Sequence, residues 1–177
     1  GLYWYHPHVH GARSVFAGLY APLIVDDPDE AELVDAGILP RSEQTLVLSD
    51  LSHYEGRPLL VPNEGTEVMN GTEGQILLVN GREQPTFDIP ASGPTRLRII
   101  NSSIARFWRL SVPGQTLYRI GGEGGLLDAV QVDGGTRSAV ITRLSDGAEI
   151  GATDMDLRYA RGELLLAPEE RVDAVLS

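Results

Sequence analysis

The sequence predicts an all-β protein, a Greek-key sandwich or barrel, on three observations. Glycine and proline account for 20 and 11 of the 177 residues and separate many short apolar runs. Val, Leu and Ile dominate these runs, which recur at an interval of about ten residues. The segment Thr95–Asn101 alternates in polarity, with Leu97 and Ile99 on one face and Arg96 and Arg98 on the other, as expected of a half-buried strand.

The predicted strands are short and bounded by turn residues. In chain order they are Leu2–His8, Tyr20–Val25, Gln44–Ser52, Ile76–Val79, Thr95–Asn101, Phe107–Ser111, Tyr118–Gly121, Ala139–Leu144 and Arg171–Leu176. Asn80-Gly81 and Ser145-Asp146-Gly147 supply turns for hairpins, because glycine tolerates a positive φ. The polar stretch 132–162 is predicted to be a hairpin excursion on the domain surface.

One helix is clearly indicated, in the acidic stretch that follows the second strand. Asp27 suits its N-cap, Pro28 its first position, and Gly37 the position after its last turn. The chain also opens in the middle of a strand pattern, so we expect a fragment of a longer protein.

The helix suggests where the domains divide. We interpret residues 28–41 as a linker containing the short helix. It would connect the last strands of one domain, residues 1–27, to a second domain, residues 42–177.

The composition excludes several classes of protein. With 14 Lys and Arg against 25 Asp and Glu, the formal charge is −11, opposite to the basic surface that a nucleic-acid-binding protein needs. There is no cysteine, which excludes disulfides, thiol nucleophiles and thiolate copper ligands within the chain. No apolar run approaches the ~18 residues of a membrane-spanning helix.

The histidines form the most informative pattern. His6, His8 and His10 lie within five residues, and the fourth histidine is His53. Because side chains alternate along a strand, the three clustered histidines are expected on one face, with neighbouring Cα atoms about 6.6 Å apart. Two such imidazoles can share one metal ion or bind two adjacent ions. Imidazole suits copper, zinc, iron and nickel, so the spacing leaves the metal open.

Two other chemistries fit the histidine segment less well. A cupin would need a glutamate shortly after His-x-His, where residues 12–15 read Ala-Arg-Ser-Val. A nucleophilic hydrolase would need a Gly-x-Ser-x-Gly elbow or a cysteine, and the chain contains neither.

The glycine-rich segment 121–125 is predicted to be a β-turn rather than a phosphate loop. No Lys-Ser or Lys-Thr follows it, and no helix pattern begins after it. The carboxylates in and after this segment are expected to be solvated turn residues rather than acid/base catalysts: Glu123, Asp128, Glu169 and Glu170.

Residues 1–11, Gly-Leu-Tyr-Trp-Tyr-His-Pro-His-Val-His-Gly, and 18–27, Gly-Leu-Tyr-Ala-Pro-Leu-Ile-Val-Asp-Asp, carry a resemblance. They are similar to the end of the first cupredoxin domain of three-domain multicopper oxidases, the laccase-like family that includes copper-efflux oxidases. The aromatic-aromatic-His-x-His segment resembles the second of the family's four copper motifs. Four later segments resemble the second, non-copper domain: Leu78–Arg82, Arg96–Asn101, Gly121–Leu127 and Leu166–Asp173.

The resemblance implies a cupredoxin-like Greek-key fold with copper as cofactor. His6 and His8 match the motif histidines that bind the type 3 copper pair of a trinuclear cluster, one imidazole to each ion. His10 is not a ligand in the family and is expected to pack or hydrogen-bond beside the site. His53 matches no motif, and Trp4 and Tyr5 are expected to pack the strand beside the copper site.

The resemblance also implies what lies outside the chain. The family's first motif, His-Trp-His-Gly, would precede it. The two motifs with the remaining cluster histidines and the ligands of the type 1 copper would follow it. We therefore expect the isolated chain to be catalytically inactive and to bind copper weakly or not at all.

A parent protein of this family would oxidise a phenol, an amine or a metal ion and reduce dioxygen to water by four electrons. Its partners would be dioxygen, a small reducing substrate and the missing first and third cupredoxin domains, in the periplasm or outside the cell. No nucleic acid and no membrane span are expected. The alternative is a non-catalytic cupredoxin-like module that binds copper, assists assembly or has lost copper.

Overall fold

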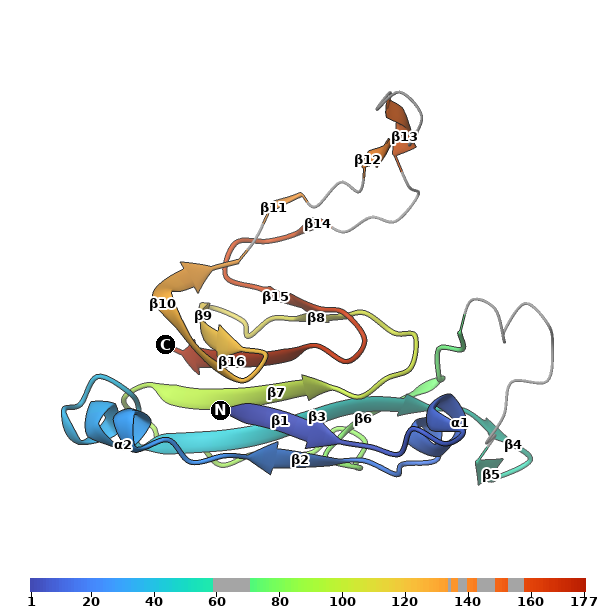
Figure 1. Cartoon of the computed structure of the whole chain (residues 1–177), viewed down its shortest axis with the longest axis horizontal. Helices are drawn as coiled ribbons and strands as arrows, with labels where there is room; N and C mark the ends of the chain where they lie inside the picture. The colour runs from blue at the N-terminus through green and yellow to red at the C-terminus, as the bar shows by residue number, and fades with distance from the viewer. Residues whose placement is uncertain (59–70, 134, 137–139, 143–148, 153–157) are drawn as a thin grey trace.

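The computed structural model describes residues 1–58, 71–133, 135–136, 140–142, 149–152 and 158–177. Strands dominate it (Figure 1). Its elements are β1 (Leu2–Tyr5), α1 (Gly11–Phe16), β2 (Ala21–Ile24), α2 (Pro28–Asp35), β3 (Ser42–Leu51), β4 (His53–Tyr54), β5 (Arg57–Pro58), β6 (Ile76–Val79), β7 (Thr95–Asn101), β8 (Trp108–Leu110), β9 (Leu117–Gly122), β10 (Gly125–Val132), β11 (Gly135–Thr136), β12 (Val140–Thr142), β13 (Glu149–Ala152), β14 (Arg158–Tyr159), β15 (Leu164–Leu166) and β16 (Arg171–Leu176).

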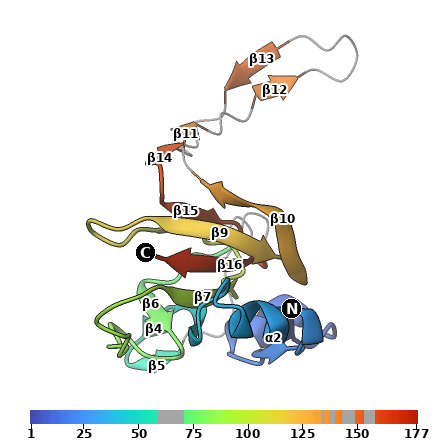
Figure 2. The same cartoon turned by 90° about the vertical axis from the view of Figure 1, so that its left-hand side faces the viewer.

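The prediction of an all-β sandwich is confirmed. Six strands form one sheet in the order β10-β9-β16-β7-β3-β6, in which only the pair β3 and β7 is parallel. A two-stranded sheet, β8 with β15, lies over it as the second layer (Figure 2). Apolar side chains of both layers fill the space between them, and burial of each stabilises the fold by about 1.5–3 kcal/mol. They are Leu48, Leu97, Ile99, Trp108, Leu117, Leu164, Leu166, Val172, Ala174 and Leu176.

The predicted strands agree with the sheet to within a few residues. β6, β7 and β16 have the predicted bounds, whereas β10 and β15 were not predicted. Of the predicted strand Ala139–Leu144, the structure describes only the part that forms β12. The predicted turn at residues 145–147 lies outside the described residues. β11 pairs with β14 and β12 with β13, and these antiparallel pairs project from the sandwich as the predicted hairpin excursion (Figures 1 and 2).

Helix α2 begins and ends as predicted. The Asp27 carboxylate accepts a hydrogen bond from the Asp29 backbone N–H at 3.0 Å, and Pro28 occupies the first position. Gly37 takes a φ of 72° directly after the C-cap, a conformation in which glycine carries no steric penalty. The other helix, α1, comes earlier in the chain. It was not predicted, because its six residues have no side-chain cap.

One expectation about β7 is wrong. Its arginines do not lie on a solvated face: Arg96 is 2% exposed and Arg98 is 5% exposed. Asp173 of β16 accepts hydrogen bonds from Arg96, including one from Nε at 2.8 Å. Glu30 of α2 accepts from Arg96 Nη1 at 2.9 Å and from Arg98 Nη2 at 3.1 Å. Arg98 Nε also lies 2.8 Å from Glu43 Oε2. We call these five residues the buried ion network, which compensates the charges that folding removes from water.

The network predicts a specific pH dependence of stability. Burial by itself would raise the pKa of Glu30, but the hydrogen bond from Arg96 and the charges of Arg96 and Arg98 outweigh it, so the pKa lies below its usual value. A carboxylate with a lowered pKa in the folded state stabilises the protein above the ordinary glutamate pKa, and this contribution is lost as the pH falls through the folded value.

We therefore expect the difference in unfolding free energy between the wild type and Glu30→Gln to be largest at neutral pH and to shrink between about pH 5 and pH 3. Urea denaturation of both proteins across this range measures it. A difference that stays constant with pH would show that the Glu30 charge does not stabilise the fold.

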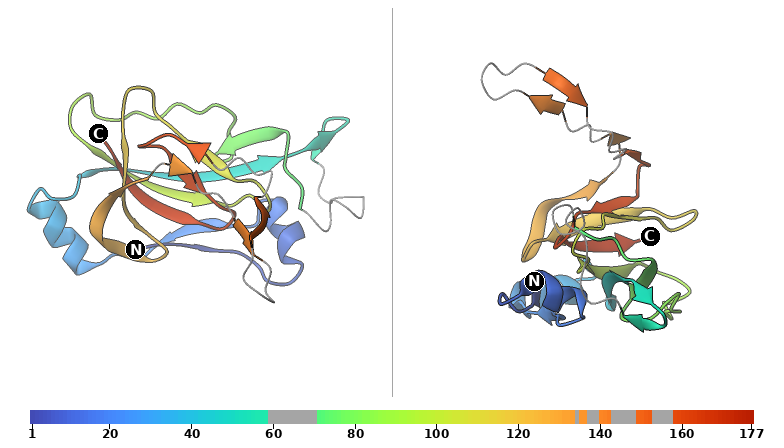
Figure 3. Two further views of the ribbon diagram at one scale, coloured as in Figure 1. Left: turned by 90° about the horizontal axis from the view of Figure 1, so that it is seen from above. Right: turned by 90° about the vertical axis from the view of Figure 1, so that its right-hand side faces the viewer.

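The β1–β2 hairpin packs on the other face of the six-stranded sheet. Its Leu2 joins Val47 of β3 and Ile100 of β7 in a second apolar cluster, against which Trp4 and Tyr20 pack. Seen from above, the hairpin runs along the sheet with α2 at one end and α1 at the other (Figure 3). The predicted histidine segment therefore starts from a strand that is fixed to the sheet.

Candidate metal site

The histidine segment is less regular than predicted. β1 ends at Tyr5, where its pairing with β2 ends, and Pro7 has no N–H to continue a ladder. The chain bends at His8, and His10 has a left-handed φ of 52° directly before α1. The prediction of a strand that reaches His8, with three histidines on one face of it, is therefore wrong.

His6 and His8 nevertheless lie side by side. Their ring centroids are 5.0 Å apart with an interplanar angle of 24°, so the rings are stacked. Trp4 stacks on His6 with a centroid distance of 4.5 Å and an angle of 29°. The imidazole lone pairs lie in the ring planes, so the lone pairs of two stacked rings lie in two separate, nearly parallel planes. This arrangement suits two adjacent ions better than one ion held by both rings.

The two histidines line a cavity of about 180 Å³. Trp4 and α1 form one side of it, and Ser103, Ile104 and Glu169 approach from the sheet domain. His6 Nδ1 is buried and has no hydrogen-bond partner among the described residues. Two neutral imidazoles, one with a buried unpartnered nitrogen, are donors of the kind that copper accepts. His6 and His8 therefore fit two of the ligands of a copper pair.

The other histidines lie apart from this arrangement. His10 and His53 are both exposed, His10 before α1 and His53 in β4. Among the described residues, no group of three or more His, Cys, Asp or Glu side chains is arranged to hold a metal ion. In the same part of the chain, neither helix is long and apolar enough to cross a membrane.

Sequence reasoning was only partly right about the carboxylates. Glu170 is not a solvated residue, because it pairs with Arg119 at 3.0 Å and accepts from the Ala167 N–H at 2.8 Å. Glu123 lies in the β9–β10 turn as expected but forms an ion pair with Arg171. Asp128 is exposed, but it lies in β10 rather than in a turn, and Glu169 is exposed in the turn before β16.

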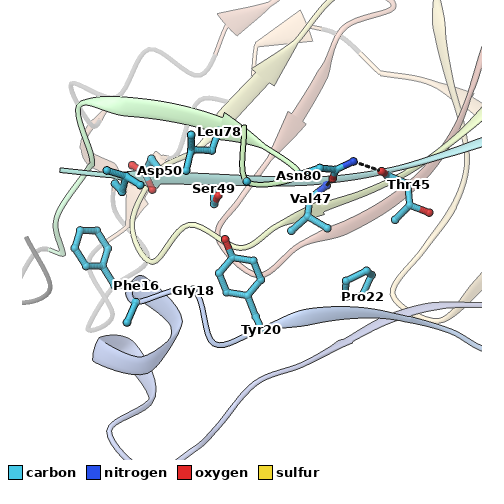
Figure 4. A pocket seen from close by; sticks show the side chains of 13 residues that line it. Phe16, Gly18, Tyr20, Pro22, Thr45, Val47, Ser49, Asp50, Leu78 and Asn80 are labelled. Atoms are coloured by element: carbon cyan, nitrogen blue, oxygen red, sulfur yellow. Dashed lines mark hydrogen bonds between the residues drawn. The ribbon is translucent and has the colours of Figure 1, made fainter. Parts of the chain in front are cut away.

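A larger cavity, of about 640 Å³, lies elsewhere, between the hairpin and β3 and β6 (Figure 4). Phe16, Tyr20 and Val47 contribute to a mainly apolar lining. The polar lining residue Asn80 is used to join strands: its amide donates to Thr45 O at 2.9 Å and accepts from the Val47 N–H at 2.7 Å. We place the candidate site at the histidines because their donor atoms have metal chemistry and this lining does not.

Known proteins resemble both the sequence and the fold. No protein-family model matches the sequence. Multicopper oxidase MmcO of Mycobacterium tuberculosis is 30% identical over 146 residues, which are 66% of this chain and 27% of that protein. The crystal structure of the McoA multicopper oxidase from Aquifex aeolicus superposes on the whole chain with a TM-score of 0.70 and 28% identity, and the match covers 33% of McoA. The chain belongs to the multicopper oxidase family. Its fold is the cupredoxin-like β-sandwich of these oxidases.

The chain is also similar to proteins that are not named as oxidases. Cell division protein FtsP of Proteus mirabilis is 32% identical over 161 residues, or 85% of this chain and 33% of that protein. The chain therefore spans about a third of the length of the curated relatives that it matches. Copper is the cofactor that the oxidase relatives imply.

Proposed function

We propose that this chain is part of a multicopper oxidase in which His6 and His8 hold the type 3 copper pair, one imidazole to each ion. The stacking of the two rings supports this assignment, because an ion in the plane of one ring does not lie in the plane of the other. The segment before His6 adds support, because Trp4 stacks on that ring and fixes its plane. Bound copper would supply the one-electron chemistry that reduces dioxygen.

We also propose the domain division that the sequence predicts. Residues 1–27 would be the last strands of a first cupredoxin domain, 28–41 a linker and 42–177 the second domain, without a type 1 copper. The chain's coverage of about a third of its relatives leaves room for domains on both sides. The other ligands would come from those domains, and the 177 residues alone would be catalytically inactive.

The activity that we propose for the whole protein is the oxidation of a small reducing substrate, a phenol, an amine or a metal ion, coupled to the reduction of dioxygen to water. This chain's contribution is to fix two imidazoles beside a cavity and to hold the first domain against the second through the apolar cluster of Leu2, Val47 and Ile100. We place the protein in the periplasm or outside the cell.

The experiment is a titration of the chain with copper(II) chloride, followed by the fluorescence of Trp4, which contacts His6. We expect weak, saturable quenching that is lost in both His6→Ala and His8→Ala and retained in His10→Ala and His53→Ala. The melting temperature of each variant shows that it is folded. Quenching that persists in both His6→Ala and His8→Ala, or equal losses in all four variants, would contradict the assignment.

The second candidate is a non-catalytic cupredoxin-like module. The observation that favours it is the match to cell division protein FtsP at 32% identity, similar to that of the oxidase MmcO. The complete reading frame separates the two functions: an oxidase would carry His-Trp-His-Gly before this chain and the cysteine-bearing motif after it, whereas a reading frame without the cysteine-bearing motif would contradict the oxidase.

A further inference from the structure

The cavity that holds the two histidines also receives a carboxylate from a distant part of the sequence. Glu169 lies in the turn between β15 and β16 and lines this cavity together with His6 and His8. Its carboxylate has no hydrogen-bond or ion-pair partner among the described residues, although several arginines pair with other acids nearby. The carboxylate is therefore free to interact with whatever the cavity binds.

The backbone at Glu169 is held in a conformation that its side chain disfavours. Its φ is 69°, in the left-handed region that favours glycine. Two contacts fix it there: its N–H donates to Asn101 O at 2.9 Å, and its carbonyl accepts from Arg171 Nη1 at 2.8 Å. Strained non-glycine residues cluster at functional sites, where the strain is offset by the surrounding structure. The turn could use glycine here, so a glutamate points to a role for its side chain.

The next residue shows how a structural carboxylate behaves in the same turn. Glu170 bonds Arg119 and the Ala167 N–H, and so ties the turn to the sheet. Glu170 does not line the cavity. The two consecutive glutamates thus have separate positions: Glu170 is bonded within the fold, and Glu169 lines the cavity that the histidines line.

We propose that Glu169 is a positioning residue of the metal site, contributed by the second domain, whose negative charge strengthens the binding of copper at His6 and His8. This inference rests on the proposed function. Neutral imidazoles leave the charge of a bound cation uncompensated, and a carboxylate in the same cavity attracts that cation. The attraction does not require the carboxylate to be a ligand.

The test repeats the copper(II) titration on Glu169→Gln, Glu169→Gly and, as the matched control, Glu170→Gln. We expect both Glu169 variants to bind copper about fivefold or more weakly than the wild type. The loss should become smaller at high salt, since mobile ions screen the charge. Glu169→Gly should melt no lower than the wild type, because it removes the backbone strain. Glu170→Gln should melt lower yet bind copper as the wild type does.

Each outcome distinguishes the two proposals. Unchanged copper affinity in both Glu169 variants, with quenching that still depends on His6 and His8, would overturn the role of Glu169 alone. A loss of affinity that does not depend on salt, or an equal loss in Glu170→Gln, would also overturn it, because a general disturbance of the turn would then be the cause. Quenching that is independent of both histidines would instead overturn the proposed function.

Discussion

Replacement of Arg96 with methionine is expected to lower the unfolding free energy by about 3–5 kcal/mol, because removal of one partner from a buried ion pair leaves the other charges uncompensated. Arg96 has almost no exposed surface, and it joins Glu30 of α2 to Asp173 of β16. Burial lowers the pKa of Arg96, but the hydrogen bonds and charges of Asp173 and Glu30 outweigh it and raise the pKa above its usual value. The arginine therefore stays charged at every accessible pH.

Urea denaturation at neutral pH measures this effect, and a second ion pair provides the control. Arg41 lies 2.8 Å from Asp35, but both side chains are largely exposed, so Arg41→Met should cost less than about 1 kcal/mol. If both replacements had equally small effects, the network would not be buried as described.

Replacement of Leu164 with alanine is expected to cost about 2–5 kcal/mol, because it opens a cavity between the two layers of the sandwich. Leu164 is fully buried in β15 and packs in the main core cluster. The control is Leu77→Ala. Leu77 of β6 is 45% exposed, so this replacement should lower the unfolding free energy much less. Thermal or urea unfolding of both variants measures the difference. Similar losses at the two positions would contradict the packing of β8 and β15 onto the six-stranded sheet.

Local patterns were sufficient to predict much of the fold. β6, β7 and β16 follow from apolar alternation between turn residues, and α2 follows from Asp27, Pro28 and Gly37, because these signals act within a few residues. The burial of Arg96 could not be predicted from its own strand. Its partners Glu30 and Asp173 lie 66 and 77 residues away, and only the tertiary fold brings them together.

The candidate site, too, was predicted only where neighbouring residues determine the structure. The spacing of His6 and His8 predicted neighbouring imidazoles, and the rings do lie together. His10 itself takes a left-handed φ before α1 and so leaves the common strand face, and nothing in the neighbouring sequence clearly predicts this conformation. Glu169 is an exposed turn residue as expected, but nothing in the surrounding sequence indicates that its turn reaches a cavity lined by His6 and His8.

The central claim is that His6 and His8 each bind a copper ion, and anomalous X-ray scattering tests it most directly. Crystals of the chain soaked in copper(II) chloride would be measured on both sides of the copper absorption edge. The account predicts two separate anomalous peaks, one within coordination distance of a ring nitrogen of each histidine. Peaks only at other residues, or a single peak shared by both rings, would contradict it.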